Sequence, residues 1–457
     1  MRLLWIKAWR DFWSNLPAFL ACIAMMALAI ALLIGFSSAY FNLGDSARYT
    51  YEKLSFLDAS IALHDSSPNL GERIRALPQV SAVEARRQSP IRIQLPRGEF
   101  VPGLALGMPH DRPVTVNQLV ILKGSALRSP RGEVLLEKRF ADVQGYRIGD
   151  WITLEVKPTD QRRYLIVGLI SSPEYLWLTP DRLDPRPAAR RFGVCFLSHA
   201  DMASLMQTPL INELHMRFAP SADPLVLGRR IQQMLDSERD GPLRPRWEQP
   251  SYALLERDRL AFAGVASVFP AALLGLSGLM LFLTLWQLIH QQRKQVGILL
   301  CQGVSQGQLS VGYFLLSLFV AVASATLGSI FGPLLSHWAT SYYVNTLGLP
   351  FSRESVQLNA VLLGWVVALA ISLLTATIAL GSLLKRSPLE LLRSDFAPQA
   401  ASRLLAWIPL RLNYRLLFPL RNLLRQPGRS LVMIAGVAMA NGLLLMIGQV
   451  SGILFIL

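Results

Sequence analysis

Two long apolar segments, residues 261–290 and 309–338, dominate the hydrophobic pattern of this chain. Neither contains Asp, Glu, Lys or Arg, and each is longer than the roughly 20 residues with which a helix crosses a bilayer. The short polar loop between them, residues 291–308, holds the basic pair Arg293 and Lys294. Because positive charge in a short loop resists translocation, the pattern predicts a helical hairpin whose loop faces the cytoplasm.

Three further segments have the length and polarity of membrane spans, namely residues 16–40, 358–384 and 430–457. The last would just cross a bilayer at about 1.5 Å per residue. A cleaved secretory signal fits residues 16–40 poorly, because the apolar run starts late and is too long for the core of a signal peptide. We therefore expect an uncleaved anchor, a cytoplasmic N-terminus and five transmembrane helices.

Two amphipathic segments, residues 1–15 and 385–429, are predicted to lie along the cytoplasmic surface of the membrane. Trp5, Trp9 and Trp13 recur at helical spacing in the first segment, with charged residues between them. Leucines alternate with arginines in the second segment, which forms a basic connector. Both patterns are typical of interfacial helices that contact lipid headgroups.

The large polar region, residues 45–258, has frequent proline and glycine and short apolar runs, as a folded domain outside the membrane does. Its patterns predict strands at 59–63, 91–95, 133–136, 151–156, 164–170, 194–197 and 213–218, and helices at 69–76, 138–143, 199–206 and 224–235. An arrangement in two lobes fits this order, while the strand pairing stays open. The predicted fold class is therefore a membrane α-helical bundle of five transmembrane helices with an inserted extracytoplasmic α+β domain.

The formal net charge of +15 is informative because of where the basic residues lie in the chain. Most of the excess lies in three short segments that flank apolar runs, namely residues 1–11, 293–294 and 385–429. This distribution is a topology signal and a contact for anionic lipids. A nucleic-acid partner is therefore not expected, because a binding footprint would concentrate basic residues within the polar domain.

The sequence contains few candidate residues for catalysis, metal binding or phosphate binding. Cys22, Cys195 and Cys301 fall in different predicted compartments, which excludes an intrachain disulfide framework, and we interpret them as structural. No histidine pair with metal-ligand spacing has a third ligand, and no lysine follows a glycine as a phosphate-binding loop requires. Acids such as Asp150 and Glu174 fall in predicted turns and are interpreted as structural.

No nucleophile and base arrangement is recognisable, and the spans contain no ionisable Asp, Glu, Lys or Arg for a proton or ion path. We therefore expect no catalytic, cofactor-binding or metal site and no secondary-transporter mechanism. Any energy must come from a partner.

An internal repeat is indicated when the sequence is displaced by about 411 positions. Arg10 then falls on Arg421, Asp11 falls on Asn422, and most of the first span falls within the last apolar run, residues 430–457. Any two basic segments followed by apolar runs would match to some degree, so chance similarity remains the alternative. If the repeat is real, a second unit begins near residue 411, and either a longer native chain or a separate polypeptide supplies the rest.

Several segments together carry a resemblance to a known family. Gln291–Leu309, with the sequence QQRKQVGILLCQGVSQGQL, resembles the cytoplasmic loop of FtsX-like or MacB-like ABC permeases. Ser387–Arg393 is similar to the segment that follows the last span of a family unit, and Arg421–Arg429 is similar to the segment that precedes the first span. Further fits to the long, two-unit permeases are Gly132–Glu137, Ile148–Asp150 and Ser172–Tyr175.

The resemblance implies the permease subunit of an ABC transporter complex in the bacterial cytoplasmic (inner) membrane. Its implied partners are a cytoplasmic ATPase dimer that binds the ATP, a second permease unit or copy, membrane lipids and, in some members, an extracytoplasmic protein. ATPase-coupling residues implied by the loop are Gln291, Arg293, Lys294, Gln295, Gly297, Leu300 and Gly303, and those of the connector are Pro388, Glu390 and Arg393.

The loop also departs from the family pattern. Gln291 and Gln295 replace two family glutamates, and Leu300 replaces an arginine, so docking either differs here or depends on Arg293, Lys294 and the following helix. ATP-driven closure of the partner would tilt the spans and move the outer domain. Family members use such motion for export of hydrophobic compounds, lipoprotein release or control of extracytoplasmic enzymes.

Two other classes of protein remain as alternatives. A membrane receptor or sensor would use the outer domain to bind a ligand without any ATPase, although no segment of the sequence has the pattern of a cytoplasmic signalling domain. A membrane-bound enzyme would need a reactive cluster within residues 45–258, and the sequence reveals none.

Overall fold

The computed structural model describes residues 2–66, 69–157, 160–176, 178, 189–234 and 240–384. The chain divides into two compact units. The first, called here the helical unit, comprises Met1–Tyr40, Ala263–Ala339 and the segment that begins at Ser355; the second, the outer domain, comprises Phe41–Phe262 and Thr340–Glu354.

Some predictions fall outside the described residues. These concern the basic connector 385–429 with Pro388, Glu390 and Arg393, and the fifth span at 430–457.

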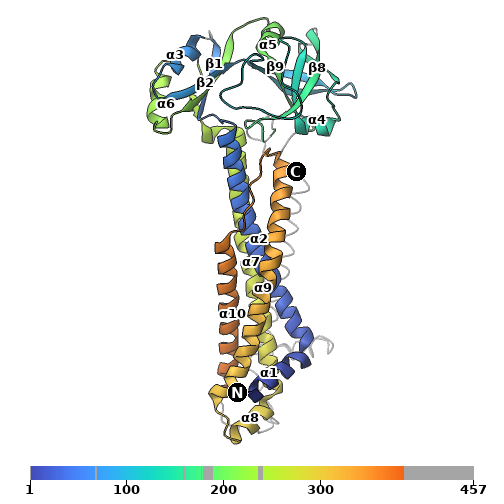
Figure 1. Ribbon diagram of the computed structural model, residues 1–457, viewed down its shortest axis with the longest axis vertical. Coiled ribbons are helices and arrows are strands. Elements are labelled where there is room, and N and C mark those ends of the chain that lie inside the picture. The colour runs from blue at the N-terminus through green and yellow to red at the C-terminus, as the bar shows by residue number, and fades with distance from the viewer. Residues whose placement is uncertain are drawn as a thin grey trace, which may run out of the picture. The chain divides into compact units, whose positions relative to one another are not determined.

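Among the described residues, four helices are long and apolar enough to cross a membrane (Figure 1). They are α2 (Leu16–Lys53), α7 (Pro250–Gln291), α9 (Gln306–Leu347) and α10 (Leu358–Leu384). Two further helices are short. Helix α1 (Arg2–Ser14) precedes α2, and helix α8 (Arg293–Cys301) connects α7 with α9. Each predicted span that falls among the described residues lies within one of the four long helices.

Helix α2 extends beyond the apolar segment that predicted it. The predicted span ends at residue 40, but the helix continues, and Leu43, Ala47 and Tyr51 recur in it at every fourth position. These three side chains are buried in one cluster with Leu255 of α7. The helix continues because one face still buries apolar groups, a signal that a search for uncharged runs does not register.

Close helix packing in the helical unit depends on glycines of α9. A Cβ atom at Gly328 would lie 2.6 Å from Cγ2 of Ile30, and one at Gly332 would lie 2.7 Å from Cβ of Ile34. Both isoleucines belong to α2 and are fully buried. Small residues at these positions therefore let α2 and α9 approach closely, as helices in membranes commonly do.

The outer domain contains strands interleaved with short helices. Its strands are β1 (Ala59–Ser66), β2 (Val80–Arg86), β3 (Gln88–Gln94), β4 (Phe100–Met108), β5 (Val120–Gly124), β6 (Glu133–Glu137), β7 (Trp151–Lys157), β8 (Asp160–Ser171), β9 (Gly193–Ser198), β10 (Ile211–Phe218) and β11 (Leu243–Pro245). Its short helices are α3 (Asn69–Arg75), α4 (Lys138–Gln144), α5 (His199–Met206) and α6 (Pro224–Gln232), followed by a 3₁₀ turn at Arg246–Glu248.

In the described part of the chain these strands form two sheets. The four-stranded sheet has the order β11-β1-β10-β2 and is antiparallel. The seven-stranded sheet has the order β5-β8-β6-β9-β4-β3-β7, and β7 also pairs with β8. That extra pairing closes six strands into a ring, and β5 is left as an edge strand beside β8.

The predicted α+β character of the outer domain is confirmed, and every predicted strand and helix overlaps an observed one. Strands β2, β4, β5 and β11 were missed. β4 contains Pro102, Gly103 and Gly107, which are typical of turns rather than strands. Gly103 is needed because a Cβ atom there would lie 2.8 Å from the carbonyl oxygen of Gly193 on the paired strand β9.

Candidate functional site

The helical hairpin singled out by the sequence is formed by α7, α8 and α9. Helix α8 ends before Gly303, whose φ of 92° lies in the left-handed region that favours glycine. The amides of Gly303 and Val304 donate to the carbonyls of Leu300 and Leu299, each at 3.1 Å. These bonds satisfy the last carbonyls of α8 and redirect the chain toward α9.

A reciprocal capping box begins α9. The hydroxyl of Ser305 accepts from the amide of Gln308 at 3.2 Å, and the side-chain oxygen of Gln308 accepts from the amide of Ser305 at 3.1 Å. This arrangement satisfies two amide groups that a helix start would otherwise leave without partners. α8 is therefore joined to α9 by a defined turn.

The predicted coupling residues divide between two faces of the hairpin. Gln291, Lys294, Gln295 and Gly303 are exposed, whereas Gly297 is buried and Arg293 and Leu300 are half-buried. Leu300 packs against the core of the helical unit. The first group is therefore fully accessible to a partner and Arg293 partly so, whereas Gly297 and Leu300 pack α8 against the bundle.

The exposed face of α8 also presents an apolar residue that the sequence reasoning did not single out. Ile298 is 50% exposed and lies one turn after Lys294 and Gln295. Cys301 is free and exposed on the next turn. We define Lys294, Gln295, Ile298 and Cys301 as the α8 face. The α8 face therefore offers a partner a charged, an amide and an apolar side chain together.

Helix α1 contacts the hairpin through a hydrogen bond to Gln292 and through aromatic packing against α9. The ammonium of Lys7 donates to Asp11 and to the side-chain oxygen of Gln292, both at 2.7 Å, and the hydroxyl of Tyr313 donates to the same oxygen at 3.1 Å. Phe12 lies edge-on to Phe319, with ring centroids 5.1 Å apart. Gln292 was not among the predicted site residues. The spacing of Lys7 and Asp11, four apart on one helix, is a sequence signal for their mutual contact that the sequence analysis did not use, and it gives no indication of Gln292.

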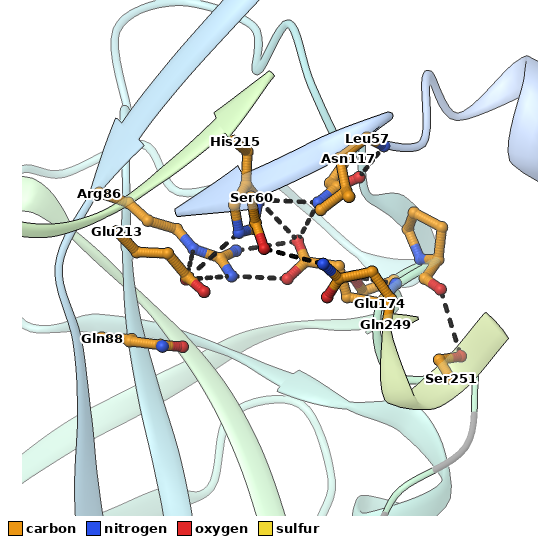
Figure 2. Close-up of polar contacts among 12 residues, drawn as sticks. Leu57, Ser60, Arg86, Gln88, Asn117, Glu174, Glu213, His215, Gln249 and Ser251 are labelled. Atoms are coloured by element: carbon orange, nitrogen blue, oxygen red, sulfur yellow. Dashed lines mark hydrogen bonds and ion pairs between the residues drawn. The ribbon is translucent and has the colours of Figure 1, made fainter. Parts of the chain in front are cut away.

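A second polar constellation lies in the outer domain and is shown in Figure 2. Arg86 donates to both carboxylate oxygens of Glu174, at 2.9 and 2.5 Å, and to Glu213 at 2.9 and 2.8 Å. These three side chains are at most 14% exposed. Such paired, charge-assisted hydrogen bonds are the strong kind and fix the planes of the partners.

His215 and Asn117 complete this ionic cluster. A ring nitrogen of His215 lies 2.8 Å from the amide nitrogen of Asn117, and its other nitrogen lies 3.3 Å from Glu213. The Asn117 amide donates to Glu174 at 2.6 Å, while its oxygen accepts from the amide of Leu57 at 2.8 Å. The cluster is thus built from β2, β10, the loop after β8 and the segment before β5.

Charge complementarity controls ionisation in the cluster. Burial opposes the charged form of Arg86, but the charges of Glu174 and Glu213 outweigh it and raise the pKa of Arg86. Burial alone would raise the pKa of Glu213, whereas Arg86 and His215 hold it well below its usual range. Arg86 and Glu213 are therefore both ionised at neutral pH, and each needs the other.

The cluster connects with the end of α2 and the start of α7, the parts of these two long helices that belong to the outer domain. The hydroxyl of Ser251, at the start of α7, donates to the carbonyl of Pro173 at 3.4 Å, next to Glu174. Leu57, which donates to Asn117, follows the end of α2. Glu174 and Asn117 therefore join the four-stranded sheet to both helix ends.

Little in this arrangement favours catalysis. Arg86 occupies the space between the two carboxylates, and among the described residues no group of three or more His, Cys, Asp or Glu side chains has the geometry to hold a metal ion. Cys22 and Cys195 are buried, as expected of structural residues, but Cys301 is exposed. The carboxylate of Asp150 accepts from the amide of Arg147 at 2.7 Å and stabilises a turn.

Comparison with known proteins gives a family for part of the chain. Residues 267–388 match the model of the FtsX-like permease C-terminal family. Solved structures matched by the chain include the periplasmic region of MacB from Actinobacillus actinomycetemcomitans, with 8% identity, a TM-score of 0.29 and coverage of 46% of this chain and 95% of that one. The extracellular domain of the ABC-type transporter YknZ from Gram-positive bacteria matches with 8% identity, a TM-score of 0.30 and coverage of 41% and 98%. No curated protein gave a match.

The matched segment 267–388 contains α8, α9 and α10 with most of α7, and so includes the turn region of the hairpin. The family resemblance inferred from the loop sequence is confirmed over this segment. Over residues 267–388 the chain is therefore similar to the FtsX-like permease C-terminal family.

Proposed function

We propose that this chain is the permease subunit of an ABC transporter complex in a bacterial inner membrane, and that its α8 face binds a separate cytoplasmic ATPase. The observation that carries this proposal is the accessible α8 face on a hairpin whose two ends are fixed. A partner that moves α8 would move α7 and α9 with it, because the capping box and the contacts with α1 leave α8 little independent freedom.

Helix α7 supplies the path for this motion. It is one continuous helix from Pro250 to Gln291, and its first turn contacts the loop that carries Glu174. A displacement at Gln291 is therefore passed along the helix to the outer domain. In this mechanism ATP is bound and hydrolysed by the partner, and the permease converts closure of that partner into movement on the other side of the membrane.

The experiment that tests the proposal is copurification of the ATPase with charge-reversal variants of the α8 face. Lys294→Glu combined with Ile298→Glu should lower the amount of bound ATPase at least about tenfold, because lost interface contacts of this kind cost about 2 kcal/mol or more. Arg97→Glu, in the exposed turn between β3 and β4, is the matched control and should bind normally.

Gly297 is not suited to this test, although the loop sequence pointed to it. Its backbone is buried against the bundle, so a bulky acidic residue there would displace α8 whether or not a partner binds. Equal recovery of ATPase with the double variant and with Arg97→Glu would refute the docking role of the α8 face. Absence of any ATPase from the purified native complex would refute the proposed function itself.

A further inference from the structure

The outer domain contains a cavity of about 780 Å³ that the proposed function does not use. Its walls come from α3 and β2 on one side, from α5 on the other, and from the segments 112–115 and 208–211. Helix α3 packs on the four-stranded sheet, and α5 follows β9 of the seven-stranded sheet. The cavity thus lies between the two sheets, and its volume is within the range of small-molecule sites, about 300–1,000 Å³.

One part of the wall is apolar. Val83 and Ala85 of β2 line the cavity, as do Met202 of α5 and Ile211 at the start of β10. Successive side chains of a strand point to opposite faces, so Arg86, next to Ala85, belongs to the ionic cluster instead. The apolar patch is therefore supplied by β2 and β10 of the four-stranded sheet and by helix α5, and it can cover a hydrocarbon group of a ligand.

The other part of the wall is cationic. Arg75, Arg87 and Arg112 line the cavity, and Glu72 is the one acidic side chain among the described residues that line it. The guanidinium of Arg112 is held by Glu84 at 2.7 and 3.2 Å, and Arg87 donates to the carbonyl of Leu210 at 3.0 Å. Two of the three cations are therefore fixed in position before any ligand arrives, which lowers the entropy cost of binding.

His199 adds a polar group to the same wall. Burial lowers the pKa of His199, and nearby Arg112 lowers it further, against the opposing charge of Glu84. The ring is therefore neutral at pH 7 and offers one donor and one acceptor. The ring can therefore orient a ligand by hydrogen bonding and adds no charge to the wall.

We propose that this cavity binds an anionic amphiphile, a molecule with a phosphate or carboxylate headgroup on an apolar body. The headgroup lies at Arg75 and Arg112, whose planar guanidinium groups match the oxygens of such anions. The apolar body covers Val83, Met202 and Ile211. The proposal rests on the chemistry of the cavity and is independent of ATPase binding at the α8 face.

The test uses the full chain in phosphatidylcholine nanodiscs and an octyl phosphate probe with a photoreactive diazirine at the chain end. Irradiation should label peptides that contain residues 80–87 or 199–211 in a saturable manner, as mapped by mass spectrometry. Excess octyl phosphate and octanoate should each prevent labelling. Octyltrimethylammonium, which has the same chain and the opposite charge, should not.

Two variants of α3 make the test specific. Arg75→Glu should weaken labelling at least about tenfold, since a charge-assisted contact is replaced by repulsion. Arg73→Glu changes another exposed arginine of α3, two residues away, that does not line the cavity, and should leave labelling unchanged. Arg75→Gln serves as a second variant if the reversal lowers the yield of folded protein, and should weaken labelling in the same direction.

Three outcomes would overturn the proposal. The first is labelling that does not saturate or falls outside the two peptides. The second is equal loss of labelling in Arg73→Glu and Arg75→Glu, or equal competition by the cationic amphiphile. The third is competition by inorganic phosphate as strong as that by octyl phosphate, which would show a simple anion site with no use for the apolar wall.

Discussion

Arg86 and Glu174 form a two-point ion pair, with hydrogen bonds of 2.9 and 2.5 Å, although 88 positions separate them in the sequence. Arg86 belongs to the four-stranded sheet, and Glu174 belongs to the loop that follows β8 of the seven-stranded sheet. Their contact therefore joins the two sheets through a buried ion pair.

Replacement of Arg86 by methionine should destabilise the outer domain by about 3–5 kcal/mol, because Glu174 and Glu213 would be left buried without their common partner. Arg48→Met is the matched control. Arg48 also pairs with an acid, Asp45, at 3.8 Å, but both side chains are exposed, so its loss should cost about 1 kcal/mol or less. Urea unfolding followed by tryptophan fluorescence measures both. Equal destabilisation would contradict the special role of Arg86.

Acid should weaken the outer domain through Glu213. Arg86 and its neighbours hold the pKa of Glu213 well below its usual value against the effect of burial, so the ionised form stabilises the fold. This contribution is complete above the unfolded pKa of about 4.3 and is lost as pH falls toward the depressed folded pKa, at about 1.4 kcal/mol per pH unit. Unfolding free energy measured from pH 6 to pH 3 should therefore fall less steeply for Glu213→Gln than for the unchanged protein. Parallel pH profiles would contradict this assignment.

The close approach of α9 to α2 should make Gly328 intolerant of even one methyl group. A Cβ atom there would lie 2.6 Å from Ile30 and 3.2 Å from the carbonyl oxygen of Ala27, so Gly328→Ala should cost about 1–3 kcal/mol. Gly275→Ala is the matched control in α7, because no atom of the described chain lies within 4 Å of the place that its added methyl group would take. Thermal melting in detergent should show a lower Tm for the first variant only. A similar Tm for both variants would mean that α2 and α9 are not tightly packed.

Thiol labelling should distinguish the three cysteines. Cys301 is exposed on the α8 face, whereas Cys22 and Cys195 are buried, and burial raises the pKa of Cys195 so that little thiolate forms. A maleimide reagent should therefore modify the native protein at Cys301, and Cys301→Ser should remove most of the signal. Added ATPase should slow this reaction if it covers the α8 face. Rapid modification of Cys195 in the folded protein would contradict the closed packing around β9.

The sequence by itself determined the features that depend on local periodicity. Uncharged runs located the long helices, and alternating residues located most strands. Such signals are readable because a helix or strand imposes its own period on burial. The loop residues also identified the family of the segment 267–388.

Only the tertiary structure decided which polar residues matter. Arg86 and Glu213 face each other across β2 and β10, and Lys7 reaches Gln292 across 285 positions, yet each residue alone has the pattern of an ordinary surface group. Likewise, the loop sequence gave Gly297 and Gln295 equal weight, and only the packing of α8 showed that one is buried and the other exposed. The physical reason is that burial of a charge is tolerated only beside a partner, and that partner is brought close by the fold and not by the neighbouring sequence.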